Sequence, residues 1–302
     1  MPVSQSSINL AAAASNQPKL QWFNITNLLA YVANASVTFG VGLTGILGPT
    51  DAEVSVKYQT LVTPAGYAFS IWGVIFVAEL LWAVVQTLPS FRSQPLVVHG
   101  VGFSYVIVSL AQIAWTLLFT LEYVTASLVA MTFILIPLMS IITSTSRLPH
   151  DSMPQYFLLK FPFEVHGGWI MAASVVNANA VLVANGYSAN SLAHAAWISL
   201  GLLTLFAIYY NRTYVVPIVL AWASFAIAVE LKHPMDSITE NFSSSSIHWL
   251  MRISESLAVS ILVTVAIQII VSRTRGRKSG SAMNPTVTTP AKPTSFKSSS
   301  RP

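Results

Sequence analysis

A glutamate and several aromatic rings interrupt an apolar stretch, TPAGYAFSIWGVIFVAEL, at residues 63–80. On a helix, at 100° per residue, one narrow face collects Phe69, Trp72, Phe76, Glu79, Ala83 and Gln86. A carboxylate near the middle of a membrane span is costly, so it faces the bundle interior and is paired or protonated there. We therefore predict that Glu79 points inward beside Trp72, towards a ligand, a proton pathway or a polar partner.

Two further stretches place rings and hydrogen-bonding groups on one side of a helix. The first side, in residues 101–121, carries Tyr105, Ser109, Gln112, Trp115, Thr116 and Phe119. The second, in residues 161–184, carries Trp169, Ala173, Asn177 and Ala180. A ring-lined space with a few polar groups suits a flat, mostly apolar ligand. The alternative is that these polar groups only hold the helices together.

Several kinds of chemistry are excluded by missing residues. The sequence has no Cys, no HExxH and no G-x-S-x-G, and no predicted span contains a Lys that could form a Schiff base. No nucleophile, base and orienting group stand in a recognisable arrangement, so an enzyme is the least favoured interpretation and we expect no cofactor or metal. Near the predicted cytoplasmic end of residues 161–184, we interpret His166, close to Glu164, as an interfacial hydrogen-bonding group.

The elements that position these residues are membrane helices. The 302-residue chain is 54% hydrophobic and only 8% charged, whereas soluble domains carry about 25% charged residues. Apolar runs near membrane-spanning length predict an all-α, polytopic bundle of about eight transmembrane helices, at 24–47, 66–88, 101–121, 124–145, 161–184, 191–210, 214–231 and 247–271. We interpret residues 1–23 as a flexible N-terminus and residues 272–302 as a disordered basic tail.

Basic residues predict the orientation of these spans. With both termini cytoplasmic, the inner segments hold five basic residues before the tail and seven within it, against two or three outside. This bias follows the positive-inside rule. Because the basic cluster directly follows the last span, its expected partners are anionic membrane lipids rather than nucleic acid. The particular membrane and any homo-oligomer stay open.

Three segments together resemble one known family. TPAGYAFSIWGVIF at 63–76 resembles the Pro-rich start and F-x-x-x-W signature of the second helix in the TspO/MBR family (tryptophan-rich sensory proteins, translocator protein). Phe69 and Trp72 are three residues apart here, one fewer than in that signature. WTLLF at 115–119 resembles the third helix, and PFEVHGGWIMAASVVN at 162–177 resembles the fifth. The resemblance implies a five-helix core at 24–184, followed by three additional helices at 185–271.

The resemblance also implies a ligand. Family members are implicated in binding tetrapyrroles and sterols in a pocket below the loop between the first two helices. The resemblance and the helix faces described above together predict a ligand-binding set: Tyr67, Phe69, Trp72, Glu79, Gln112, Trp115, Trp169 and Asn177. The predicted function is binding of a porphyrin, a sterol or a similar flat apolar ligand, with transport or sensing of it. The alternatives are a proton-coupled small-solute transporter that uses Glu79, and a structural or assembly protein.

Overall fold

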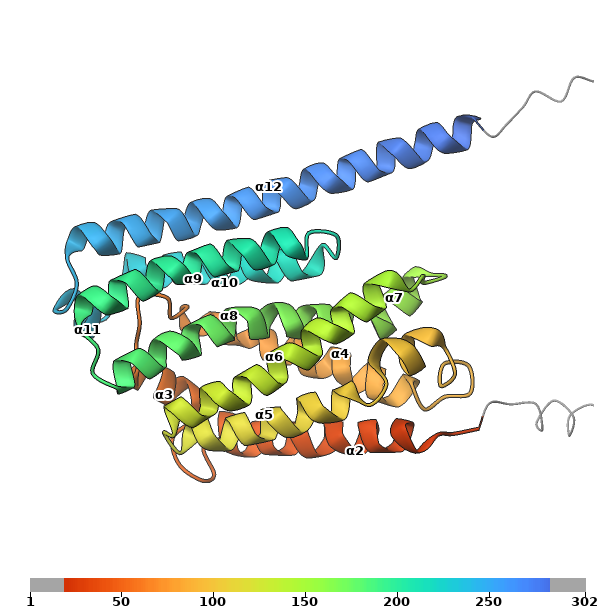
Figure 1. The fold of residues 1–302 in the computed structure, drawn as a ribbon, viewed down its shortest axis with the longest axis horizontal. Helices are drawn as coiled ribbons and strands as arrows, with labels where there is room; N and C mark the ends of the chain where they lie inside the picture. The colour runs from red at the N-terminus through yellow and green to blue at the C-terminus, as the bar shows by residue number, and fades with distance from the viewer. Residues whose placement is uncertain (1–18, 283–302) are drawn as a thin grey trace, which may run out of the picture. The chain divides into compact units, whose positions relative to one another are not determined.

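The structure, a computed structural model, describes residues 19–282 and the side chains of residues 19–274. Every regular element in this part of the chain is a helix (Figure 1). The α-helices are α2 (Trp22–Val37), α3 (Asp51–Lys57), α4 (Ile71–Val85), α5 (Ser104–Thr120), α6 (Val124–Arg147), α7 (Met153–Leu159), α8 (Phe161–Ala184), α9 (Ala189–Tyr209), α10 (Val215–Lys232), α11 (Asp236–Thr239) and α12 (Ser244–Ala282). Three irregular helical segments complete the set: η1 (Thr38–Leu43), η2 (Gly66–Ser70) and η3 (Leu96–Val101).

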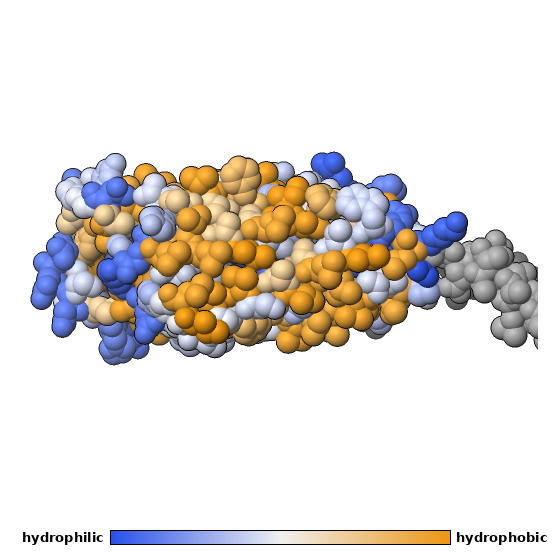
Figure 2. All heavy atoms as spheres, turned by 90° about the horizontal axis from the view of Figure 1, so that it is seen from below, coloured by the Kyte–Doolittle hydropathy of each residue, from blue (hydrophilic) through white to orange (hydrophobic). Residues whose placement is uncertain are grey.

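Seven helical runs in the described residues are long and apolar enough to cross a membrane, and α5 is a shorter apolar helix of 17 residues. Each of the eight predicted spans overlaps one of these helices. Apolar side chains cover the middle of the face shown in Figure 2, and hydrophilic ones gather towards its two ends. The protein is therefore an integral, multi-pass membrane protein with a helical bundle, as the sequence predicts.

Two short helices, α3 and α7, interrupt the connections between spans, and we did not predict them from the sequence. Thr50 begins α3 with a capping box, because its hydroxyl accepts from the Glu53 amide while the Glu53 carboxylate accepts from the Thr50 amide. Ser152 caps α7 in the same position by accepting from the Gln155 amide. Seven residues are too few to show a clear hydrophobic period, so these helices depend on caps and on tertiary contacts.

Helix α8 is packed by α4, α6, α7, α9 and α10. Two adjacent glycines let its neighbours approach closely. A Cβ at Gly167 would collide with the Ile142 side chain of α6, and one at Gly168 would lie 3.0 Å from the Val219 Cβ of α10. Small residues at such crossings are typical of membrane bundles. The ring-bearing face of α8 is thus held between two other spans.

The two ends of the chain differ in part from the sequence predictions. α12 continues to Ala282, so residues 272–282 are helical where we expected the disordered tail to begin. Extending an existing helix is far easier than starting one, and Arg and Lys are good helix formers. Before Val265, one face of α12 is buried, with Leu250 and Ala258 at its centre. From Ala266 onward the chain forms a second unit. The remaining predictions, for residues 1–18 and 283–302, lie outside the described residues.

Candidate functional site

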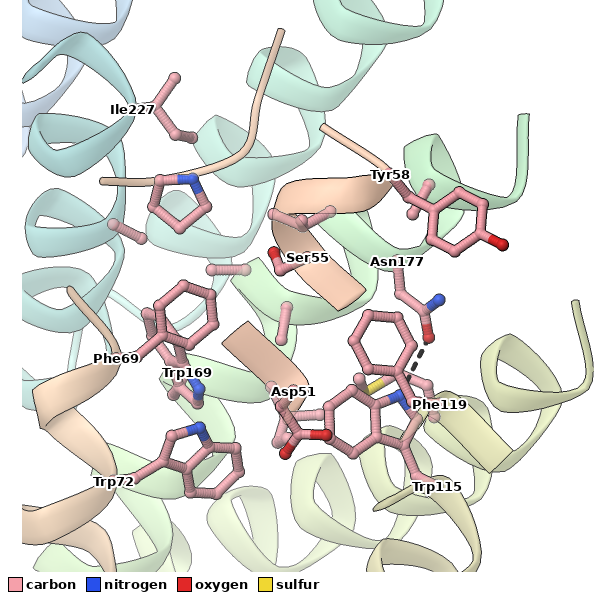
Figure 3. Close-up of a pocket in the computed structure, with 18 residues that line it drawn as sticks. Asp51, Ser55, Tyr58, Phe69, Trp72, Trp115, Phe119, Trp169, Asn177 and Ile227 are labelled. Atoms are coloured by element: carbon pink, nitrogen blue, oxygen red, sulfur yellow. Dashed lines mark hydrogen bonds between the residues drawn. The ribbon is translucent and has the colours of Figure 1, made fainter. Parts of the chain in front are cut away.

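A cavity of about 50 Å³ lies among α3, α5, α8, α10 and the segment that leads into α4. Figure 3 shows its lining, in which rings predominate. The aromatic members are Tyr58, Phe69, Trp72, Trp115, Phe119 and Trp169. Small and aliphatic side chains, including Ala172, Ala173 and Ile227, fill the remaining wall. The lining is therefore mostly apolar and suits an apolar guest.

The rings hold one another in place. Trp169 lies edge-on to Phe69, with ring centroids 5.6 Å apart, and edge-on to Trp72, with centroids 6.4 Å apart. On the opposite wall, Trp115 stacks on Phe119 at 4.9 Å with an angle of 14° between the ring planes. Such edge-to-face and stacked pairs are favourable geometries for aromatic rings. Because the rings come from different spans, packing of the bundle shapes the cavity.

An amide fixes the position of one tryptophan. The Trp115 indole N–H donates to Asn177 Oδ1 at 3.0 Å, and Asn177 Nδ2 donates to the Ser127 hydroxyl at 3.2 Å. All three side chains are buried. These bonds join α5, α6 and α8, and Figure 3 shows the first of them beside the cavity. The hydrogen bond from Trp115 to Asn177 thus fixes the orientation of the Trp115 ring.

Asp51, the first residue of α3, also lines the cavity. The Oδ1 atom of its half-buried side chain is shielded from solvent and has no hydrogen-bond partner among the described residues. Burial raises the pKa of Asp51 to about 7, because an unpaired carboxylate is disfavoured away from water. The segment before α3 packs closely here, since a Cβ on Gly42 would lie 2.5 Å from Asp51 Oδ2.

A fully buried polar cluster lies beside Trp72. Glu79 Oε1 is 2.6 Å from His166 Nδ1, and Glu79 Oε2 accepts from the Tyr105 hydroxyl at 2.9 Å. His166 Nε2 lies 3.1 Å from Gln112 Oε1. The Trp72 ring contacts the His166 ring edge-on, with centroids 5.8 Å apart. The cluster therefore touches the wall of the cavity but does not line it.

The structure divides the predicted ligand-binding set into three groups. Five residues line the cavity: Phe69, Trp72, Trp115, Trp169 and Asn177. Glu79 and Gln112 lie in the buried cluster, so Glu79 points inward as expected but meets a polar partner. Tyr67 is 42% exposed and packs edge-on against Trp222, away from the cavity lining.

The interpretation of His166 as an interfacial group is wrong. Its side chain is 1% exposed and lies within hydrogen-bonding distance of Glu79. The helix end that we expected at the membrane surface is covered by α7, whose Tyr156 donates to the buried Glu164 at 2.7 Å. Because α7 was not predicted, the depth of His166 could not be predicted either.

Sequence reasoning also missed the part of the site that α3 supplies, namely Asp51, Ser55 and Tyr58. One signal was available, since Thr50 and Glu53 have the spacing of a capping box and thereby mark a helix start. Nothing in the spacing alone shows that this short helix lies against the rings of α5 and α8.

Comparison with known proteins identifies one family. The model of the family described as TSPO-like protein matches residues 22–271. This range runs from the start of α2 into α12, and so extends beyond residue 184, where the resemblance seen in the sequence ends. No curated protein and no solved structure matches the chain.

Proposed function

Because the chain belongs to the TSPO-like family, we propose that it binds a flat, mostly apolar ligand of the tetrapyrrole or sterol type and transports or senses it. The ligand site is the cavity between α3, α5, α8 and α10. One observation carries the proposal: rings from three spans and from the α3 segment meet around a single space. Burial of a ring system between such walls stabilises a complex by about 25 cal/mol for each Å² of apolar surface removed from water.

A porphyrin requires the cavity to widen. Its present volume of about 50 Å³ is well below the roughly 300–1,000 Å³ typical of sites for drug-sized ligands. We define the covering loop as residues 44–65, which include α3, and propose that this wall moves to widen the cavity. It is held by polar contacts, including the Tyr58 hydroxyl to Glu122 at 2.9 Å and Gln59 to Glu230 at 2.9 Å.

Tryptophan fluorescence of the detergent-purified protein, titrated with protoporphyrin, tests this proposal. We expect saturable quenching for the wild type and weaker binding for Trp72→Phe, because the smaller ring removes contact area from the wall. Trp249→Phe is the matched control, since Trp249 is 59% exposed on α12 and does not line the cavity. Displacement of the porphyrin by cholesterol would show that sterols use the same site. Quenching that is linear in ligand and equal in both variants would overturn the proposal.

The buried cluster supports a second candidate function, proton-coupled transport of a small solute. As placed, both His166 nitrogens lie near acceptor oxygens, and a ring that carries a proton on each nitrogen would donate to both. Gln112 Nε2 has no partner, so turning this amide would let a neutral His166 accept instead. When His166 gains or loses a proton, rotation of the Gln112 amide thus keeps the hydrogen bond between the two side chains. Ionisable residues inside membrane spans commonly form such proton relays.

Proton flux into liposomes that contain the protein tests the second candidate. We expect Glu79→Gln to abolish pH-driven flux, whereas Glu255→Gln, on the exposed part of α12, leaves it unchanged. Flux that is the same for Glu79→Gln and the wild type would eliminate this function.

We also propose that both termini are cytoplasmic. The excess of basic residues in the connections on that side supports this orientation.

A further inference from the structure

Asp51 is the single charged side chain among the residues that line the cavity in the described part of the chain. The remaining lining consists of rings, aliphatic groups and a few neutral polar groups. An acidic group in such surroundings is costly unless something pairs with it. The ionised Asp51 carboxylate therefore needs a cation or hydrogen-bond donor, and the apolar walls of the cavity supply neither.

No cation within the described residues meets that requirement. Asp51 forms no ion pair there, and its Oδ1 has no hydrogen-bond partner. The nearest charged groups on α3 are otherwise engaged: Glu53 with Thr50, and Lys57 with Glu122. Of the elements that pack on α3, η1 carries no titratable side chain and α5 carries only Tyr105, which bonds to Glu79. A ligand bound in the cavity can therefore supply the cation that pairs with the Asp51 carboxylate.

The rings around Asp51 suit a cationic partner. Figure 3 shows its carboxylate between Trp72 and Trp115, at the edge of the space that the rings enclose. Indole faces attract alkylammonium and aromatic cations, and this attraction adds to that of a carboxylate. Gly42 packs against the carboxylate so closely that a Cβ there would displace it. The carboxylate is thus confined beside the two indoles.

We propose that the ligand of this cavity carries a cationic nitrogen on its flat apolar body, and that Asp51 pairs with this nitrogen while Trp72 and Trp115 contact the ring system. This inference rests on the proposed function and narrows the ligand class. A ligand whose polar groups are carboxylates, such as protoporphyrin, binds only with Asp51 protonated.

The pH dependence follows from the ionisation of Asp51. A permanent cation binds the ionised carboxylate, so its affinity increases as the pH rises through about 7, the pKa to which burial raises Asp51. An anionic ligand prefers the protonated form, so its affinity falls over the same range. A neutral ligand makes no ion pair with either form, and we expect a much smaller change. His166 and Glu79 do not line the cavity and are bonded to each other.

Equilibrium dialysis with a matched pair of probes tests the proposal. The pair is 1-methylquinolinium, a flat permanent cation, and 1-methylnaphthalene, its neutral analogue of the same shape. We expect the cation to bind the wild type at least roughly tenfold more tightly than it binds Asp51→Asn. The neutral probe should bind both proteins alike. Glu53→Gln is the control, because it removes an exposed charge from the same helix and keeps the capping pattern.

The possible outcomes separate this proposal from the one on which it rests. Saturable binding of the neutral probe, with no advantage for the cation and no rise in cation affinity between about pH 6 and 8, overturns the cation site but leaves the cavity as an apolar site. Failure of both probes and of protoporphyrin to bind overturns both proposals. The probe comparison and the pH dependence use the wild type alone, so they remain decisive if Asp51→Asn fails to fold.

Discussion

The side-chain amide of Asn177 holds one tryptophan of the cavity lining, Trp115, in position. It accepts from Trp115 and donates to Ser127, so one side chain connects three helices. Inside a bundle these groups find no water to replace a lost partner. The position of Trp115 is therefore set by hydrogen bonding as well as by ring stacking.

Asn177→Ala should lower the free energy of unfolding by about 1–3 kcal/mol, because it leaves a buried indole N–H without an acceptor. It should also weaken ligand binding by freeing Trp115. Thermal unfolding in detergent measures the first effect and the porphyrin titration the second. Asn190→Ala, at an exposed position of α9, should change neither. Equal stability of both variants would contradict a structural role for Asn177.

The Glu79–His166 pair makes a second prediction for single residues. Removing one partner leaves the other polar group buried and unpaired, which costs about 1–3 kcal/mol, and more for a charged group. Glu79→Gln and His166→Gln should each destabilise the protein by this amount, and the double variant by less than the sum. Unfolding of all three variants in detergent tests this coupling, and strictly additive effects would show that the two groups do not interact.

At the scale of helices, α8 matters because two of its glycines set its distance to α6 and α10. Gly168→Ala should destabilise the bundle, since the new methyl group would lie 3.0 Å from Val219 Cβ and 3.4 Å from the Val216 Cα. Gly201→Ala in α9 is the matched control, because nothing lies within 4 Å of the added Cβ. The control should be neutral or stabilising by up to about 1 kcal/mol, as Ala is the better helix former. Unfolding temperatures that fall equally for both would contradict the close packing of α8.

The helices that cross the membrane could be predicted from the sequence, and the helices that do not cross could not. Long apolar runs locate α6 and α8 to within a few residues, because span length and hydropathy are strong signals. The face of α4 that carries Trp72 and Glu79 was predicted correctly from its period. The seven-residue helices α3 and α7 have no such signal. Asp51 on α3 and the burial of His166 beneath α7 were consequently missed.

At the scale of the whole molecule, α10, one of the last three predicted helices, is bonded to the site. The backbone amide of Ala65, in the covering loop, donates to Ala226 of α10, and the Trp222 indole of α10 donates to the Ala68 carbonyl at 3.2 Å. α10 also contributes Ala223 and Ile227 to the cavity lining. The cavity is completed by contacts between helices that are far apart in sequence. Periodicity within one helix does not predict such contacts.

The proposed orientation can be tested with single cysteines, because the natural sequence contains none. With cytoplasmic termini, exposed Ser93 lies inside and exposed Ser237 lies outside. Ser237→Cys should react with an impermeant maleimide in intact cells when the protein is in the plasma membrane, and Ser93→Cys only after permeabilisation. In an organelle, sealed vesicles of known sidedness serve the same purpose. The reverse labelling pattern would invert the topology.

The tethers of the covering loop have a consequence for how long a bound molecule stays. The loop is bonded to Glu122, in the turn between α5 and α6, and separately to Glu230 of α10. A ligand that leaves the cavity past this loop requires these two bonds, and the bond from Ala65 to Ala226, to open. The association and dissociation rates of the ligand are then lowered by the same factor. The residence time becomes longer, while the dissociation constant stays the same. Shortening either tether's side chain would therefore quicken exchange without altering how much ligand is held at saturation.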